Sequence, residues 1–117
     1  MNLIKLSSDL IRFKSVTPNS AGSLEFIEKI LKKNKFNCHL LEFGNKKIKN
    51  LYAEIKGGEG PNLCFAGHTD VVPAGNLKDW ATNPFKPTIK NGVLYGRGAS
   101  DMKTAIAAFI HASLEFL

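Results

Sequence analysis

Three side chains have the types and positions needed for metal or acid–base chemistry, and two of them are neighbours. His68 and Asp70 lie two residues apart, directly after the apolar run Asn62–Ala66. If a strand continues through them, its period of two puts both side chains on one side, where the carboxylate can reach the imidazole. A metal-bound histidine commonly donates its second ring N–H to such a carboxylate. A surface His-x-Asp pair at a strand end also arises by chance, so spacing alone leaves both interpretations open.

Asp101 is the third such side chain, and it stands where the glycine-rich loop Gly96–Ser100 meets an apolar segment. Its position favours a helix N-cap, in which the carboxylate accepts amide hydrogens of the first turn. The other interpretation is a metal-binding carboxylate at a chain reversal, which Gly96 and Gly98 would permit.

The same loop lacks both common sequence patterns for nucleotide phosphates. A dinucleotide fingerprint starting at Gly96 needs a sixth-position glycine, but Asp101 stands there and would repel a pyrophosphate. A phosphate loop before Lys103-Thr104 needs glycines where the chain has Arg97 and Met102. Both readings are excluded.

Helices and strands that would position these residues can be read from apolar spacing and turn residues. Helical periodicity covers residues 3–13, 23–34 and 102–117, with Ser23 as a predicted N-cap. Strands are expected at 37–43, 51–55 and 62–66, and Asn91-Gly92 predicts the turn of a hairpin over 88–95.

Two of these elements carry expectations about burial. The apolar run at 62–66 predicts a strand buried on both faces. The last segment is apolar on most sides and is expected to be covered on several of them. Together the elements predict an α/β domain, a mixed sheet with flanking helices.

Length and composition place the chain among globular proteins. It has 117 residues, 44% of them hydrophobic and 22% charged, which excludes disordered, collagen-like and coiled-coil classes. The longest apolar stretch, Thr104–Leu114, is shorter than the ~20 residues of a membrane span. No secretory or transit signal is evident, so a cytoplasmic location is expected. Cys38 and Cys64 lack metal-ligand spacing and are expected to be small buried hydrophobes.

The net charge of +6 comes almost wholly from lysine, since Arg12 and Arg97 are the only arginines among 16 basic residues. Lysine supplies point charges rather than the paired donors that read bases, so nucleic acid is not an expected partner. The alternative is a non-catalytic basic binding module that uses the lysines of residues 29–35 and 46–49.

Two blocks of residues resemble a known family, the M20-type dinuclear-zinc amidohydrolases and exopeptidases. They are Phe65–Gly75 (FAGHTDVVPAG) and Gly92–Lys103 (GVLYGRGASDMK), joined by Trp80, Asn83-Pro84-Phe85 and the early segment Ser15–Pro18. Thr104 departs from the pattern, where the family usually has glycine, and is expected to affect helix packing rather than metal binding.

The resemblance implies roles for the three side chains. His68 would ligate one zinc ion, Asp101 would bridge two, and Asp70 would be the catalytic-site carboxylate that orients His68. Two Zn²⁺ ions per subunit are implied, with Co²⁺ able to replace them. The reaction would be metal-assisted amide hydrolysis.

Within the family the residues are most similar to desuccinylases that release succinate and LL-diaminopimelate. The Ala99-Ser100 pair supports this choice, whereas acetylornithine deacetylases, the alternative, often have Thr-Cys there. The resemblance further implies that residues 1–117 are the N-terminal portion of the catalytic domain. The general-base glutamate, the remaining ligands and the lid domain that forms a homodimer would lie beyond Leu117, so this chain alone is expected to be inactive.

Overall fold

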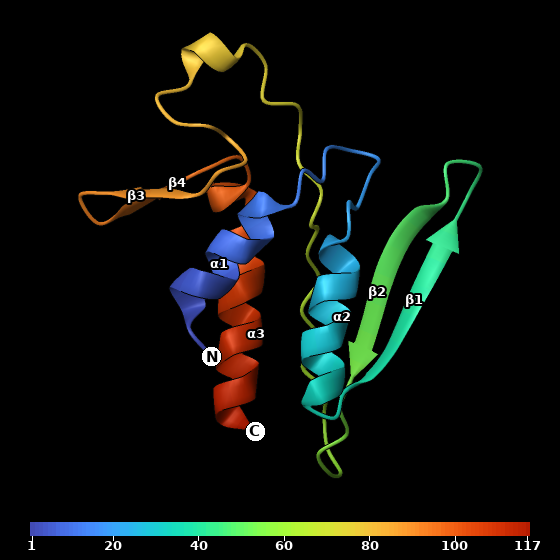
Figure 1. Cartoon of the computed structure of the whole chain (residues 1–117). Coiled ribbons are helices and arrows are strands. Elements are labelled where there is room, and N and C mark those ends of the chain that lie inside the picture. Colours follow the sequence, from blue (N-terminus) through green and yellow to red (C-terminus); the bar gives the residue numbers. More distant parts are fainter.

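Three helices and two small antiparallel sheets form a mixed α/β fold in the computed structural model, which describes residues 1–117. The bounds in chain order are α1 Leu3–Arg12, α2 Ser23–Lys33, β1 Asn37–Phe43, β2 Ile48–Glu54, β3 Thr88–Lys90, β4 Val93–Tyr95 and α3 Thr104–Phe116. A 3₁₀ turn at Leu77–Asp79 and an irregular helical stretch at Ala99–Lys103 complete the list. Figure 1 shows α1 and α3 side by side, with α2 between them and the β1–β2 hairpin.

The apolar stripes of the three helices meet in one core. α1 packs against α3, and α2 also packs against the hairpin. The buried cluster consists of Leu6, Leu10, Ile27, Leu31, Ile106, Ala107 and Ile110. Within each helix these residues recur at helical spacing, and in α1 and α2 they belong to the apolar stripes that predicted the helices.

The helix starts are capped in different ways. Asn2 caps α1, because its side-chain oxygen accepts the amide hydrogen of Lys5 at 3.0 Å. The predicted Ser23 cap is wrong, since the N-cap of α2 is Gly22 at φ 90° and Ser23 is already helical. The Ser23 hydroxyl instead donates to the Ser20 carbonyl at 2.7 Å and lies 3.2 Å from the Thr69 hydroxyl.

The β1–β2 hairpin is confirmed, although β2 begins at Ile48, three residues earlier than predicted. The strands pair antiparallel in a register that joins Cys38 to Ala53 and Leu40 to Leu51. These four side chains are half-buried on the face that α2 covers, as the alternation of a strand requires. The β3–β4 hairpin is also confirmed, with its turn at Asn91 (φ 50°) and Gly92 (φ 77°).

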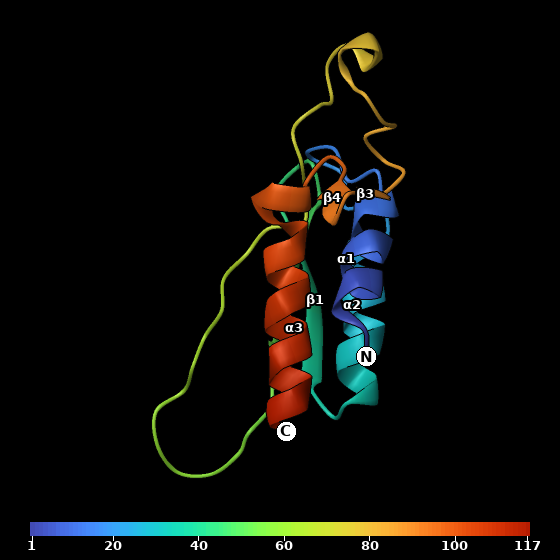
Figure 2. The same ribbon diagram turned by 90° about the vertical axis from the view of Figure 1, so that its left-hand side faces the viewer.

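The predicted strand at 62–66 is wrong. Its backbone makes no backbone hydrogen bond, and Leu63 is 87% exposed. An apolar run becomes a buried strand only where neighbouring strands pair with it, and here the single parallel contact is an isolated bridge from Val16 to Val71. In Figure 2 the connection that leads from β2 towards this run lies well apart from the helices. Cys64 lies in this stretch and is exposed, so its expected burial is also wrong.

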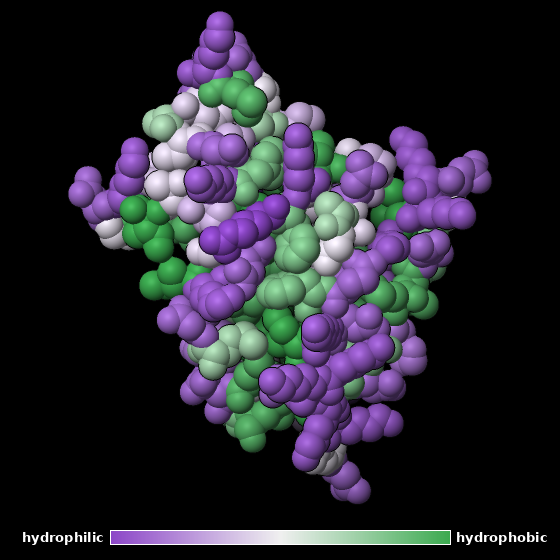
Figure 3. All heavy atoms as spheres, in the orientation of Figure 1, coloured by the Kyte–Doolittle hydropathy of each residue, from purple (hydrophilic) through white to green (hydrophobic).

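One face of α3 is buried and the rest is open, which corrects the expectation of burial on several sides. Phe109 stacks on Phe65 with ring centroids 4.4 Å apart, while Phe116 is 91% exposed. Hydrophobic side chains also remain visible in the middle of the face in Figure 3, between hydrophilic ones. No helix has both the length and the apolar character required to cross a membrane.

Candidate metal centre

The segment that carries His68 and Asp70 is held by the chain that leaves α1. The amide of Val71 donates to the Ser15 carbonyl at 2.9 Å, and the amide of Thr17 donates to the Val71 carbonyl at 3.1 Å. The Ser15 hydroxyl donates to the Thr69 carbonyl at 2.7 Å. Three hydrogen bonds, one at Thr69 and two at Val71, therefore fix the backbone on both sides of Asp70.

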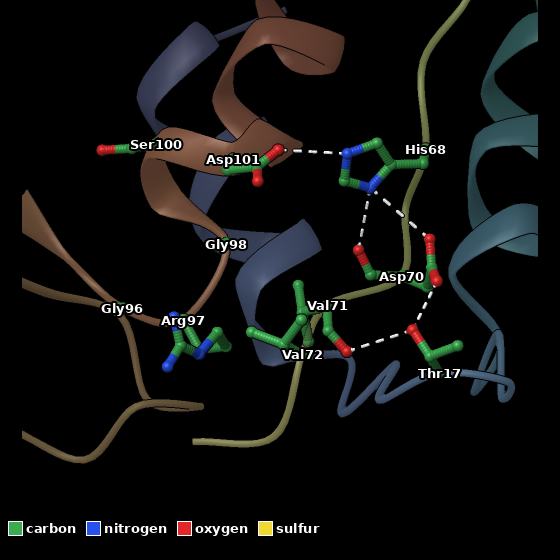
Figure 4. A pocket seen from close by; sticks show the side chains of 10 residues that line it. All are labelled: Thr17, His68, Asp70, Val71, Val72, Gly96, Arg97, Gly98, Ser100 and Asp101. Carbon is green, nitrogen blue, oxygen red and sulfur yellow. Dashed lines mark hydrogen bonds and ion pairs between the residues drawn. The ribbon is translucent and has the colours of Figure 1, made fainter. Parts of the chain in front are cut away.

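The imidazole of His68 lies between two aspartates (Figure 4). Its Nδ1 atom is 3.0 Å from the backbone oxygen of Asp70 and 3.4 Å from Oδ1 of the same residue. Its Nε2 atom is 3.0 Å from Oδ1 of Asp101. The structure thus brings together all three residues singled out in the sequence and places the two carboxylates on opposite ring nitrogens.

Asp101 does not cap α3, so the N-cap interpretation is wrong. α3 has no side-chain cap, and Asp101 has extended dihedrals (φ −130°, ψ 95°) within the irregular stretch Ala99–Lys103. Its carboxylate is 85% exposed and has His68 as its partner. The peptide bond between Asp101 and Met102 is cis.

The backbone on either side of Asp101 is anchored more firmly than its side chain. Gly98 has φ 86°, and its carbonyl accepts the amide hydrogen of Lys103 at 2.8 Å. The Lys103 side chain is fully buried, and its ammonium donates to the Phe13 carbonyl at 2.8 Å. Burial lowers the pKa of Lys103 to about 8. This contact joins the start of α3 to the end of α1.

Arg97 forms one wall of the cavity beside the two aspartates. Its guanidinium lies 5.0 Å from the centre of the Trp80 ring, and its Nη2 donates to the Pro73 carbonyl at 3.4 Å. The Trp80 indole N–H donates to the Ala74 carbonyl at 2.9 Å. The cavity measures about 280 Å³ and is lined by Thr17, His68, Asp70, Val71, Val72, Gly96, Arg97, Gly98, Ser100 and Asp101.

The surroundings of His68 favour the protonated form of its ring more than water does. The hydrogen bond to the Asp70 carbonyl raises the pKa of His68, and the charges of Asp101 and Asp70 raise it further against partial desolvation.

The donor set fits part of a zinc site. Imidazole nitrogen and carboxylate oxygen are ordinary zinc ligands at about 2.0–2.2 Å, and Nε2 of His68 already faces Oδ1 of Asp101. Asp70 lies at the other ring nitrogen, in the position of a carboxylate that orients a ligand. No group of three or more potential ligands occurs in the chain, whereas a catalytic zinc takes three protein ligands.

Known proteins match the chain along nearly its whole length. A succinyl-diaminopimelate desuccinylase of Wolbachia pipientis subsp. Culex pipiens (strain wPip) is 59% identical over 96% of this chain and 28% of its own length. One of Rhodospirillum centenum (strain ATCC 51521 / SW) is 52% identical over 97% of this chain and 30% of its own. Residues 64–117, which include both site segments, match peptidase family M20/M25/M40.

Over these residues the chain is similar to the M20 family. A solved M20-like structure, human carnosine dipeptidase 1, superposes with a TM-score of 0.75 at 26% identity, over 97% of this chain and 28% of that one. This likeness confirms the predicted fold class. The chain spans 28% to 30% of the length of the desuccinylases it matches.

Thr17 is a site residue that motif spacing did not single out. It lies 53 residues from Asp70, and its hydroxyl donates to Oδ2 of that carboxylate at 2.5 Å. The only signal was its place in the early segment Ser15–Pro18, which carried the family resemblance without a role.

Proposed function

We propose that residues 1–117 form the N-terminal part of the catalytic domain of a metal-dependent amide hydrolase of the M20 family. The main support for this proposal is the arrangement around the His68 imidazole, with Asp101 at Nε2 and Asp70 at Nδ1. His68 and Asp101 would hold metal, and Asp70 would orient His68. The remaining ligands, the general base and the lid domain would come from residues outside this chain.

The residues of this chain would prepare the ligand rather than carry the proton transfer. With its N–H at Nδ1 directed to Asp70, the neutral imidazole keeps its lone pair at Nε2, facing Asp101. A bound Zn²⁺ polarises the scissile carbonyl and lowers the pKa of its water to about 7. Asp101 has two carboxylate oxygens, of which one faces Nε2 of His68, so it would supply a donor oxygen beside the imidazole nitrogen.

The proposed reaction is hydrolysis of N-succinyl-LL-diaminopimelate to succinate and LL-diaminopimelate, a step of diaminopimelate and lysine biosynthesis. Support comes from relatives named as succinyl-diaminopimelate desuccinylases at up to 59% identity. The Ala99-Ser100 pair before Asp101 agrees with that subgroup. The alternative is deacylation of N-acetylornithine by the same chemistry.

The proposal also covers the metal, the oligomeric state, the location and the partners. Zinc is the proposed metal, with cobalt as a replacement, because the N/O donor set suits both. The whole enzyme would be a homodimer through its lid domain, and it would work in the cytoplasm on a small-molecule substrate. Neither a nucleic acid nor a membrane is a proposed partner.

The deciding experiment uses the product of the whole reading frame that contains these residues, loaded with Zn²⁺. We expect succinate release from N-succinyl-LL-diaminopimelate and loss of that activity in the His68→Ala variant. Cleavage of N-acetylornithine without succinate release would overturn the substrate assignment. Activity that survives both His68→Ala and metal removal would overturn the proposed mechanism.

The 117-residue chain alone provides a second test. Because it supplies only two metal-binding side chains, we expect no succinate release even at saturating Zn²⁺. Turnover by this chain at the rate of the longer protein would contradict the assignment of ligands and base to residues outside it.

A further inference from the structure

The Asp70 carboxylate is held by two different side chains, one at each oxygen. Oδ1 faces Nδ1 of His68 at 3.4 Å, and Oδ2 accepts the Thr17 hydroxyl at 2.5 Å (Figure 4). A hydroxyl bonded to a carboxylate forms a charge-assisted hydrogen bond, which is shorter and stronger than a neutral one. No lysine or arginine pairs with Asp70, so Thr17 is its only side-chain partner besides His68.

Thr17 is itself fixed in place. Its amide donates to the Val71 carbonyl at 3.1 Å, beside the bridge between Val16 and Val71. Its hydroxyl also lies 3.4 Å from that carbonyl, and since it carries one proton, the 2.5 Å contact with Asp70 takes precedence. A β-branched side chain on a fixed backbone has few rotamers, so the hydroxyl has a defined direction.

Without this hydroxyl the carboxylate keeps only its 3.4 Å contact with His68. Asp70 is 41% exposed, and the terminal torsion of an aspartate is broad and roughly two-fold. Rotation about that torsion moves Oδ1 away from His68 and leaves the imidazole with the backbone carbonyl as its partner at Nδ1. A partner at the second nitrogen sets both the ring orientation and the tautomer of a histidine ligand.

We propose that Thr17 is a positioning residue whose hydroxyl fixes the Asp70 carboxylate and, through it, the imidazole of His68. The inference rests on the proposed function of His68 as a metal ligand. Thr17 does not contact the metal or the reacting atoms. It acts through Asp70, from a segment that is more than fifty residues away in the chain.

The test compares Thr17→Val, which keeps the shape but removes the hydroxyl, with Thr17→Ser, which keeps the hydroxyl. Zn²⁺ affinity is measured by calorimetry, and the absorption spectrum of the Co²⁺-loaded product of the whole reading frame reports ligand geometry. We expect about a tenfold loss of affinity and an altered spectrum for Thr17→Val, in the range seen for carboxylates behind metal ligands. Thr17→Ser should recover both to within about twofold.

A matched control and a double variant distinguish an effect of Thr17 on the orientation of Asp70 from a general effect on packing. Thr88→Val removes a hydroxyl that donates to the Lys86 carbonyl in the β3–β4 hairpin, and it should leave affinity and spectrum unchanged. In an Asp70→Ala background, Thr17→Val should add no further loss, because the residue acts through that carboxylate.

Each outcome decides one proposal. If Zn²⁺ binding depends on His68 but Thr17→Val leaves its affinity unchanged, the positioning role of Thr17 is overturned. The proposed function then stays intact. Failure of Thr17→Ser to restore the spectrum, or additive losses with Asp70→Ala, also overturns it. Zn²⁺ binding that His68→Ala does not weaken overturns the proposed metal centre, whatever Thr17 does.

Discussion

The two segments that form the candidate centre are built in opposite ways. In the segment Gly67–Val71 both the backbone and the Asp70 side chain are held in place. The backbone forms hydrogen bonds with Ser15 and Thr17, and the Asp70 carboxylate accepts a hydrogen bond from the Thr17 hydroxyl. The loop Gly96–Lys103 is held by its backbone and by the side chains of Arg97 and Lys103, but its carboxylate at Asp101 is 85% exposed and has only His68 as a partner.

This difference fits the proposed roles, in which Asp70 orients His68 and Asp101 binds a metal ion. A side chain that orients a ligand must be immobile, and its hydrogen bonds are satisfied within the chain. A side chain that binds an ion must keep lone pairs free, and water covers them until the ion arrives. Asp70 and Asp101 both contact the His68 imidazole, but they differ in the exposure of their side chains and in the hydrogen bonds that their carboxylates accept.

The largest effect on metal binding is expected from substitutions of the proposed ligands, Asp101 and His68. We expect Asp101→Asn and His68→Ala each to lower Zn²⁺ affinity by more than about 100-fold, because the first neutralises and the second removes a proposed ligand, and calorimetry measures this. Thermal unfolding should be unaffected in Asp101→Asn, since that side chain is exposed. Asp79→Asn serves as the matched surface control. A small effect of Asp101→Asn on affinity would contradict its role as a ligand.

A smaller loss of Zn²⁺ affinity is expected when Asp70, the proposed orienting carboxylate, is changed. Asp70→Asn keeps the size of the side chain but weakens the interaction with Nδ1 of His68, so Zn²⁺ affinity should fall about 10- to 100-fold. The ratio of the two losses, measured in the same buffer, checks the distinction between the segments. Equal losses for Asp70→Asn and Asp101→Asn would remove it.

The backbone of the loop can be tested through its glycines. Gly98→Ala forces an L side chain into φ 86° and places a Cβ 2.8 Å from the Val71 methyl, so we expect a loss of stability of about 2–3 kcal/mol. Gly92→Ala is the control, because φ is 77° there and no atom lies within 4 Å, so it should cost about 1–2 kcal/mol. Chemical unfolding of both variants measures the difference. Equal costs would mean that the contact with Val71 does not fix the loop.

The smallest expected effect lies outside both segments and depends on pH. Lys49 donates to Glu25 at 2.5 Å, and this hydrogen bond holds the pKa of Glu25 below its ordinary value of 4.5. A lowered carboxyl pKa stabilises the fold above that value, and the contribution is lost as pH falls through the folded pKa. Thermal unfolding between pH 7 and 3 should therefore show a flatter pH profile in Glu25→Gln, by less than about 4 °C in Tm, since solvent screens the pair.

A matched Lys49→Met variant completes that test. It should flatten the profile in the same way, and neither variant should change Zn²⁺ affinity at pH 7. A steeper profile in Glu25→Gln, or a change in metal affinity, would contradict the separation of this pair from the two site segments.

Local patterns in the sequence predicted local structure well. The stripes of α1 and α2 and the Asn91-Gly92 turn depend on residues within a few positions of one another, and the structure has each of them. The strand expectation failed because the outcome depended on a distant partner. The run 62–66 forms no strand because no strand lies beside it. The Ser23 expectation failed for a local reason, since Gly22 is the N-cap of α2 and the Ser23 hydroxyl donates to the Ser20 carbonyl.

The candidate site follows the same division. The spacing of His68 and Asp70 predicted that they could meet, because both belong to one segment. Position alone favoured an N-cap for Asp101, and only the family resemblance pointed to a metal ligand, since its contact with His68 joins residues 33 positions apart. Thr17 offered no pattern, because a threonine before a proline is common and its partner is far away in the chain.

The stacking of Arg97 on Trp80 makes the chain its own optical reporter. Trp80 is the only tryptophan, so all indole emission comes from a ring in contact with a guanidinium that lines the cavity. A ligand that pulls Arg97 away from this ring would change the emission wavelength and intensity without any attached dye. Fluorescence titrations can thus follow events at the cavity wall separately from those at His68.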